Sequence, residues 1–109
     1  MQTSAASVWD TATARQLAEV IAAIADVATT QNFLRDVMTE KEIIAISSRF
    51  EAARLLQAGN TYTEIVEKTR LSSRTVARIS DWMQNGCGGY NVAIEIARAH
   101  HSHIPPARA

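Results

Sequence analysis

The amino-acid sequence predicts an all-α fold, and three observations support this. Apolar residues recur at intervals of three and four along most of the chain. The 109 residues are 47% hydrophobic and rich in Ala, Leu, Glu and Arg, which favour helices. Glycine and proline are scarce, and three of the four glycines fall within residues 86–89. We predict one six-helix domain over residues 9–101, a disordered N-terminal segment over residues 1–8, and a flexible tail over residues 102–109.

The first predicted helix covers residues 9–28 and the second covers residues 30–37. Both have apolar positions on one side, as amphipathic helices do. The apolar positions are Leu17, Val20, Ile21, Ile24, Val27 and Ala28 in the first and Phe33, Leu34 and Val37 in the second.

The third helix is predicted over residues 39–58. Thr39 and Glu42 have the spacing of a capping box, in which each side chain satisfies the free backbone amide of the other. Gly59 ends the helix in this prediction, because glycine adopts the left-handed cap conformation without steric cost.

Three shorter helices follow. Thr61 or Thr63 caps a fourth helix that ends at Thr69, and Ser72 caps a fifth over residues 73–83. The glycines of residues 86–89 separate the fifth helix from a sixth, predicted over residues 90–101.

The charge distribution is uneven although the formal net charge is zero. Residues 1–67 contain five basic and nine acidic residues, whereas residues 68–78 contain four basic residues and no acidic one: Lys68, Arg70, Arg74 and Arg78. We call residues 68–78 the basic segment. Such segregation favours one surface that attracts an anionic partner such as DNA and others that repel it.

The basic segment lies in a stretch with the pattern of a helix-turn-helix between Thr61 and Met83. This motif needs a first helix with buried apolar residues, a tight turn, and a second helix that offers its N-terminal end to the major groove. We expect five residues to face inward: Ile65, Val66, Leu71, Val76 and Ile79.

The outward residues of this motif have the chemistry of a DNA-binding face. Ser72 and Ser73 can contact phosphate at a helix N-terminus, and Arg74 can donate two hydrogen bonds to guanine. Ala77 is small enough to allow close approach to the bases. The predicted DNA-binding residues are Lys68, Arg70, Ser72, Ser73, Arg74, Ala77 and Arg78. The simpler alternative is a helical hairpin with a solvated arginine face.

The turn of the motif departs from the usual pattern. Arg70 occupies the position where a glycine normally tolerates a positive φ. The backbone at Arg70 is therefore either strained by roughly 1 kcal/mol or turned differently.

These segments together resemble the tryptophan repressor superfamily, and more closely its TrpR-like YerC/YecD branch, over roughly residues 17–90. The resemblance rests on five blocks in order: Phe33-Leu34 with Thr39-Glu-Lys-Glu-Ile43, Arg49-Phe-Glu-Ala-Ala-Arg-Leu-Leu-Gln-Ala-Gly59, Thr61-Tyr-Thr-Glu-Ile65, Ser72-Ser-Arg-Thr-Val-Ala-Arg78, and Asn85-Gly with Gly89-Tyr90. It implies a Trp-repressor-like fold of six helices in an intertwined homodimer that binds double-stranded DNA at a near-palindromic operator.

The resemblance also bears on a corepressor site. The family residues that frame tryptophan align with Thr39, Arg49 and Arg78, which makes these three candidate ligand-binding residues. The positions that give the indole room are occupied by Ile79 and Trp82, and Asp36 replaces a leucine contributed by the partner subunit's second helix. We hypothesise that tryptophan is not the ligand. Alternatively, Arg49 pairs with an acidic neighbour and Arg78 binds phosphate.

The sequence therefore predicts a transcriptional regulator, most simply a repressor, in the bacterial cytoplasm. We expect no enzyme activity, no metal site and no cofactor, although a small-molecule corepressor of unknown identity stays open. The imidazoles His100, His101 and His103 are expected to be solvated. The chain contains no stretch long and apolar enough to span a membrane, and Cys87 is its single cysteine. The alternative functions are a helical protein-interaction adaptor that has lost DNA binding and a repressor that responds to tryptophan or another small ligand.

Overall fold

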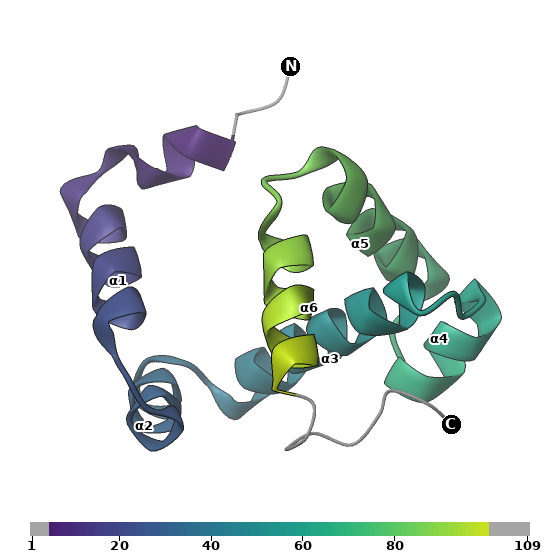
Figure 1. The fold of residues 1–109 in the computed structure, drawn as a ribbon, viewed down its shortest axis with the longest axis horizontal. Helices are drawn as coiled ribbons and strands as arrows, with labels where there is room; N and C mark the ends of the chain where they lie inside the picture. The colour runs from purple at the N-terminus through teal and green to yellow at the C-terminus, as the bar shows by residue number, and fades with distance from the viewer. Residues whose placement is uncertain (1–4, 101–109) are drawn as a thin grey trace. The chain divides into compact units, whose positions relative to one another are not determined.

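A computed structural model describes residues 5–100, which form a short 3-10 helix and six α-helices and contain no strand (Figure 1). The all-α prediction is therefore confirmed for these residues. In chain order the elements are η1 (Ala5–Asp10), α1 (Ala12–Ala23), α2 (Val27–Val37), α3 (Glu40–Gln57), α4 (Tyr62–Thr69), α5 (Ser73–Asn85) and α6 (Gly89–Ala99).

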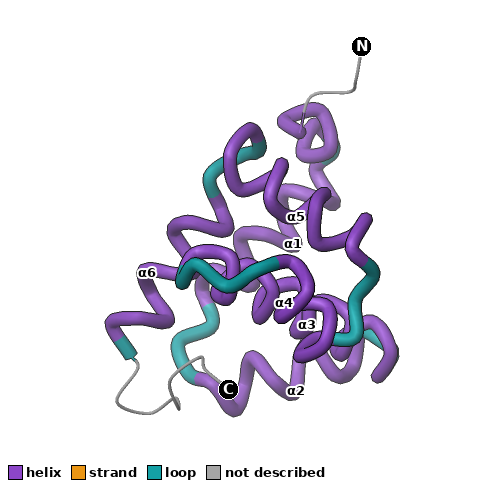
Figure 2. Tube along the Cα trace, turned by 90° about the vertical axis from the view of Figure 1, so that its right-hand side faces the viewer, coloured by secondary structure: helices purple, strands orange, loops and turns teal. Residues whose placement is uncertain are grey.

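The chain divides into two compact units within α3. The first is Met1–Ile43 and the second is Ile44–Ala109. Short loops join the helices, as the teal segments in Figure 2 show. The single domain over residues 9–101 stays a prediction, and the predicted tail over residues 102–109 lies outside the described residues, as do residues 1–4.

The first unit corrects the predicted bounds of two helices. The helix expected over residues 9–28 is interrupted: α1 ends at Ala23 and Ile24 has an extended backbone. Asp26 then caps α2, because its carboxylate accepts hydrogen bonds of 3.0 Å from both the backbone amide and the hydroxyl of Thr29. The helix expected over residues 30–37 therefore begins at Val27. Residues 5–8, expected to be disordered, belong to η1.

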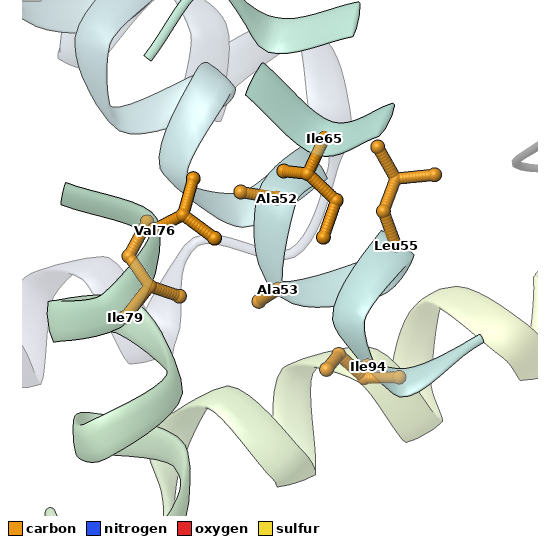
Figure 3. Close-up of a cluster of buried hydrophobic side chains, with 7 residues drawn as sticks. All are labelled: Ala52, Ala53, Leu55, Ile65, Val76, Ile79 and Ile94. Atoms are coloured by element: carbon orange, nitrogen blue, oxygen red, sulfur yellow. The ribbon is translucent and has the colours of Figure 1, made fainter. Parts of the chain in front are cut away.

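The helices of the second unit pack around one apolar core (Figure 3). Seven residues are buried, and they come from the C-terminal part of α3 and from α4, α5 and α6: Ala52, Ala53, Leu55, Ile65, Val76, Ile79 and Ile94. The two alanines of α3 allow the neighbouring helices to approach closely. The core thus fixes the position of α5 against α3.

The capping signals of α3 are confirmed. The amide of Thr39 donates to Glu42 Oε1 at 2.8 Å and the amide of Glu42 donates to Thr39 Oγ1 at 3.1 Å. At the other end Gly59 has φ +94°, and the amide of Asn60 donates to the carbonyl of Leu55 at 3.0 Å. None of the helices over residues 5–100 is long and apolar enough to cross a membrane.

Candidate nucleic-acid interface

Helices α4 and α5, joined by residues 70–72, form the predicted helix-turn-helix. Thr61 is the residue that caps α4, and Thr63 is not. Thr61 and Glu64 form a complete capping box: the Thr61 amide donates to Glu64 Oε1 at 2.8 Å and the Glu64 amide donates to Thr61 Oγ1 at 3.1 Å. The motif therefore begins at a well-defined residue.

The hydrogen bond from the Thr61 amide is the main reason why the pKa of Glu64 lies below its usual value of 4.5. Hydrogen bonds from Asn60 and Thr61 side chains and the charge of Lys68 lower that pKa further. Glu64 is therefore ionised at neutral pH and belongs to the cap of α4.

The turn contains the backbone strain that the sequence indicated. Arg70 has φ 65° and ψ 10°, the left-handed conformation, and it is the only non-glycine residue with positive φ among residues 5–100. Its amide donates to the carbonyl of Val66 at 2.8 Å, which ends α4. The hydroxyl of Thr69 donates to the carbonyl of Ile65 at 2.7 Å and accepts the amide of Leu71 at 3.3 Å. These bonds hold the turn without a glycine.

The inward face of α5 is apolar and buried. Val76 is fully buried and Ile79 is 4% exposed, and both point from α5 towards Ala52 and Ala53 of α3 (Figure 3). On α4, Ile65 is fully buried in the same core, while Val66 and Leu71 pack against it. All five residues predicted to face inward therefore lie where the motif requires them.

All seven predicted DNA-binding residues are exposed to solvent: Lys68, Arg70, Ser72, Ser73, Arg74, Ala77 and Arg78. In the part of the chain that the structure describes, the ion pairs join Arg54 to Glu51 and Arg98 to Glu95. Neither pair involves a residue of the basic segment, so its guanidinium groups remain available to an external anion.

The capping role predicted for one of these residues is confirmed. Ser72 is the N-cap of α5: its oxygen accepts the Thr75 amide at 3.1 Å, and its hydroxyl donates to Thr75 Oγ1 at 3.0 Å. Because the hydroxyl proton of Ser72 is already donated, Ser73 is the better-placed hydroxyl for a phosphate contact.

A cavity of about 370 Å³ lies beside α5 within the second unit. It is lined by six residues from α3, α5 and α6: Arg49, Thr75, Arg78, Ile79, Trp82 and Tyr90. The structure therefore brings together two of the three candidate ligand-binding residues, Arg49 and Arg78. The third, Thr39, belongs to the first unit and does not line this cavity. The carboxylate partner suggested as an alternative for Arg49 is absent from the ion pairs of residues 5–100.

Trp82 forms one wall of this cavity and is 52% exposed. Gly86, one turn later, accommodates it, since a β-carbon at Gly86 would overlap both the indole ring and the carbonyl oxygen of Trp82. Gly86, which was predicted only to separate the fifth helix from the sixth, therefore also makes room for this side chain.

Sequence reasoning did not place Thr75 and Tyr90 at the cavity. The helical spacing could have predicted the position of Thr75, because Thr75, Arg78, Ile79 and Trp82 are spaced by three, one and three residues along one side of α5. No local pattern predicts the position of Tyr90, because this residue comes from α6 and reaches the cavity only through the packing of α6 beside α5.

Cys87 is free and exposed. No group of three or more His, Cys, Asp or Glu residues within residues 5–100 is arranged to hold a metal ion. His100 is the end cap of α6, with Nδ1 2.8 Å from the carbonyl oxygen of Ile96. His101 and His103 lie outside the described residues.

Helices α4 and α5, with an exposed basic face on α5 and its preceding turn, have the architecture of a helix-turn-helix protein. The family model described as Trp repressor protein matches residues 12–98. The chain belongs to the Trp repressor family, which is a family of DNA-binding regulators rather than enzymes.

Two relatives support the TrpR-like YerC branch. The Bacillus subtilis (strain 168) protein described as uncharacterized protein YerC is 32% identical over 80 residues, which are 73% of this chain and 77% of that protein. The crystal structure of a TrpR-like protein from Eubacterium eligens ATCC 27750 is similar with a TM-score of 0.77 and 34% identity, covering 82% of this chain and 92% of that one. The predicted family and the predicted six-helix fold of the chain are thereby confirmed.

Proposed function

We propose that this protein is a sequence-specific transcriptional regulator, most simply a repressor, which binds a near-palindromic operator as a homodimer. The observation that carries the proposal is the outward face of α5 and its preceding turn, where Arg70, Arg74 and Arg78 are exposed and unpaired within residues 5–100. The N-terminal end of a helix with such a face is what helix-turn-helix proteins insert into the major groove. A bacterial regulator of this kind would act in the cytoplasm.

The zero net charge of the chain is compatible with this proposal. The four positive charges of residues 68–78 are balanced by a net charge of −4 over residues 1–67. Phosphate attraction is therefore confined to the basic segment, and the acidic part of the chain disfavours docking in other orientations.

The first unit supports the homodimer. Helices α1 and α2 contain no buried residue, and Leu17, Val20 and Ile21 on one side of α1 are 39–44% exposed. Leu17 and Val20 also line an apolar groove together with Phe33 of α2. A second copy of the chain would bury this surface, and apolar burial is the main favourable term in association.

The oligomeric state tests this part of the proposal. We expect sedimentation to give a dimer for the wild type and a shift towards monomer for Leu17→Asp, because a charge buried at an interface is costly. Ala22→Asp, on the opposite side of α1, is the matched control and is expected to remain dimeric. A monomeric wild type at micromolar concentration would contradict the proposal.

We further propose that tryptophan is not the corepressor. Ile79 is part of the core. Trp82, for which Gly86 leaves room, forms a wall of the cavity beside Arg49 and Arg78. A small ligand other than tryptophan could bind in this cavity. Calorimetric titration with L-tryptophan is expected to give no binding heat, and micromolar binding would refute this part of the proposal.

DNA binding itself is tested by gel shift. Wild-type protein is expected to retard a random-sequence duplex in a salt-sensitive manner, because counterion release dominates non-specific affinity. Arg74→Ala should weaken binding to duplexes selected from a random pool, whereas Lys41→Ala, which removes an exposed charge from the first turn of α3, should not. Absence of retardation at low salt would favour the adaptor function instead.

A further inference from the structure

Three residues form the middle of the exposed face of α5. Helix periodicity places Arg74, Ala77 and Asp81 on one side, three and four residues apart, and all three are exposed. Val76 and Ile79 occupy the opposite side and are buried. The two residues of this face nearest the N-terminus of α5 are therefore Arg74 and Ala77.

Arg78 is exposed as well but differs in its surroundings. It lines the cavity beside α5 together with Arg49, Thr75 and Trp82. A ligand in that cavity or a nearby phosphate is therefore within reach of its guanidinium group, in contrast to Arg74, which does not line this cavity. Asp81 lies one turn beyond Ala77, and its carboxylate accepts a hydrogen bond of 2.8 Å from Asn85 Nδ2. A carboxylate at that position disfavours approach of the phosphate backbone to the C-terminal half of α5.

We infer that Arg74 and Ala77 are the residues of α5 that determine operator sequence. Each operator half-site would contain a G·C pair contacted by Arg74 and, within two base pairs of it, a T·A pair whose thymine methyl group lies against the Cβ of Ala77. This inference rests on the proposed DNA-binding function and specifies the sequence that the protein recognises.

The chemistry of the two side chains supports this assignment. An arginine can donate two hydrogen bonds to O6 and N7 of guanine in the major groove, and no other base presents that pair of acceptors. Arg74 is free to do so, since it makes no ion pair among residues 5–100. Ala77 has no polar atom, and its methyl group matches the C5 methyl of thymine, the one apolar group exposed in the major groove.

The spacing limits where the two base pairs lie. Side chains three residues apart on a helix have Cβ atoms roughly 5–6 Å apart, and successive base pairs are about 3.4 Å apart along the duplex. The two contacts therefore fall on neighbouring or next-neighbouring base pairs.

Selection of duplexes from a random pool tests the inference. The wild type should enrich a half-site with G and T within two base pairs. Arg74→Ala should lose the preference for G, which for the wild type is expected to be roughly 5- to 150-fold over other bases. Enrichment of a half-site without this G and T, or retention of the G preference by Arg74→Ala, would overturn the inference while leaving the proposed DNA-binding function intact. No enrichment of any sequence would instead refute the proposed function.

Replacing the thymine by uracil tests the Ala77 contact without changing the protein. Loss of the methyl group should weaken wild-type binding by about fourfold, the effect of one buried carbon. The same replacement should leave the affinity of Ala77→Gly unchanged, because that variant has no Cβ, whereas Ala77→Ser keeps the Cβ and should show the wild-type effect of uracil. An unchanged affinity of the wild type for the uracil duplex, or equal effects of uracil on the wild type and on Ala77→Gly, would exclude Ala77 as the contact.

Discussion

Replacing Arg70 by glycine is expected to stabilise the protein while weakening its binding to DNA. Arg70 adopts φ 65° and ψ 10° at the end of α4, a conformation that costs a residue with a β-carbon about 1–2 kcal/mol and costs glycine almost nothing. Its side chain is exposed and makes no ion pair within residues 5–100, so truncation removes no packing.

The magnitude follows from two opposing terms. The relief of backbone strain is offset in part because glycine gives the unfolded chain more conformational freedom, an effect of about 0.4–1 kcal/mol. The net gain in the free energy of unfolding is then about 0.5–1 kcal/mol, and the expected rise in Tm is roughly 2–8 °C for a chain of this size.

Thermal unfolding at one fixed protein concentration measures this gain, because the Tm of a dimer depends on concentration. Arg70→Ala is the matched control: it removes the same charge and keeps the left-handed strain, so its Tm should stay close to that of the wild type. Both variants should reduce the salt dependence of DNA binding equally, by about 0.9 in log-log slope for each phosphate that the protein no longer neutralises.

The two variants separate the effect of backbone strain on stability from the effect of the Arg70 charge on DNA binding. If Arg70→Gly unfolds at the same temperature as Arg70→Ala, or at a lower one, the left-handed turn is not strained and the account of the turn is wrong. If both variants keep the wild-type salt slope, Arg70 does not contact phosphate.

Other substitutions probe the core, the cap and the outward face. Ile65→Ala should lower the free energy of unfolding measured in urea by about 2–5 kcal/mol, because Ile65 is fully buried; a smaller loss would place it outside the core. The lowered pKa of Glu64 means that its stabilising contribution is complete above pH 4.5 and is lost as the pH falls through the lower folded-state pKa. Glu64→Gln should therefore show a smaller acid-induced fall in urea midpoint than the wild type, and identical pH profiles would contradict this. Asp81→Asn should raise affinity for any duplex about threefold by removing a repulsion of roughly 0.6 kcal/mol at a phosphate distance of about 7 Å, and unchanged affinity would place Asp81 away from DNA.

Local signals in the sequence predicted most of the second unit. The inward positions of the helix-turn-helix, the cap at Ser72 and the left-handed residue at Arg70 all depend on neighbours within one or two helical turns. In the first unit a local signal was missed: Asp26 and Thr29 have the spacing of an N-cap, but the continuous apolar stripe of residues 17–28 favoured an unbroken helix. The apolar periodicity predicted one helix through residue 28, but the N-cap at Asp26 sets the start of α2 at Val27.

The sequence by itself determined the family, the helical class and the set of exposed basic residues, because periodicity and the pattern of charges are local properties of the chain. The tertiary structure decided which side chains meet. The packing of α3, α5 and α6 around one core places Arg49, Arg78 and Tyr90 at a single cavity. These residues are separated by up to 41 positions in the chain, and no spacing rule relates positions that far apart, because their contact depends on how several helices pack.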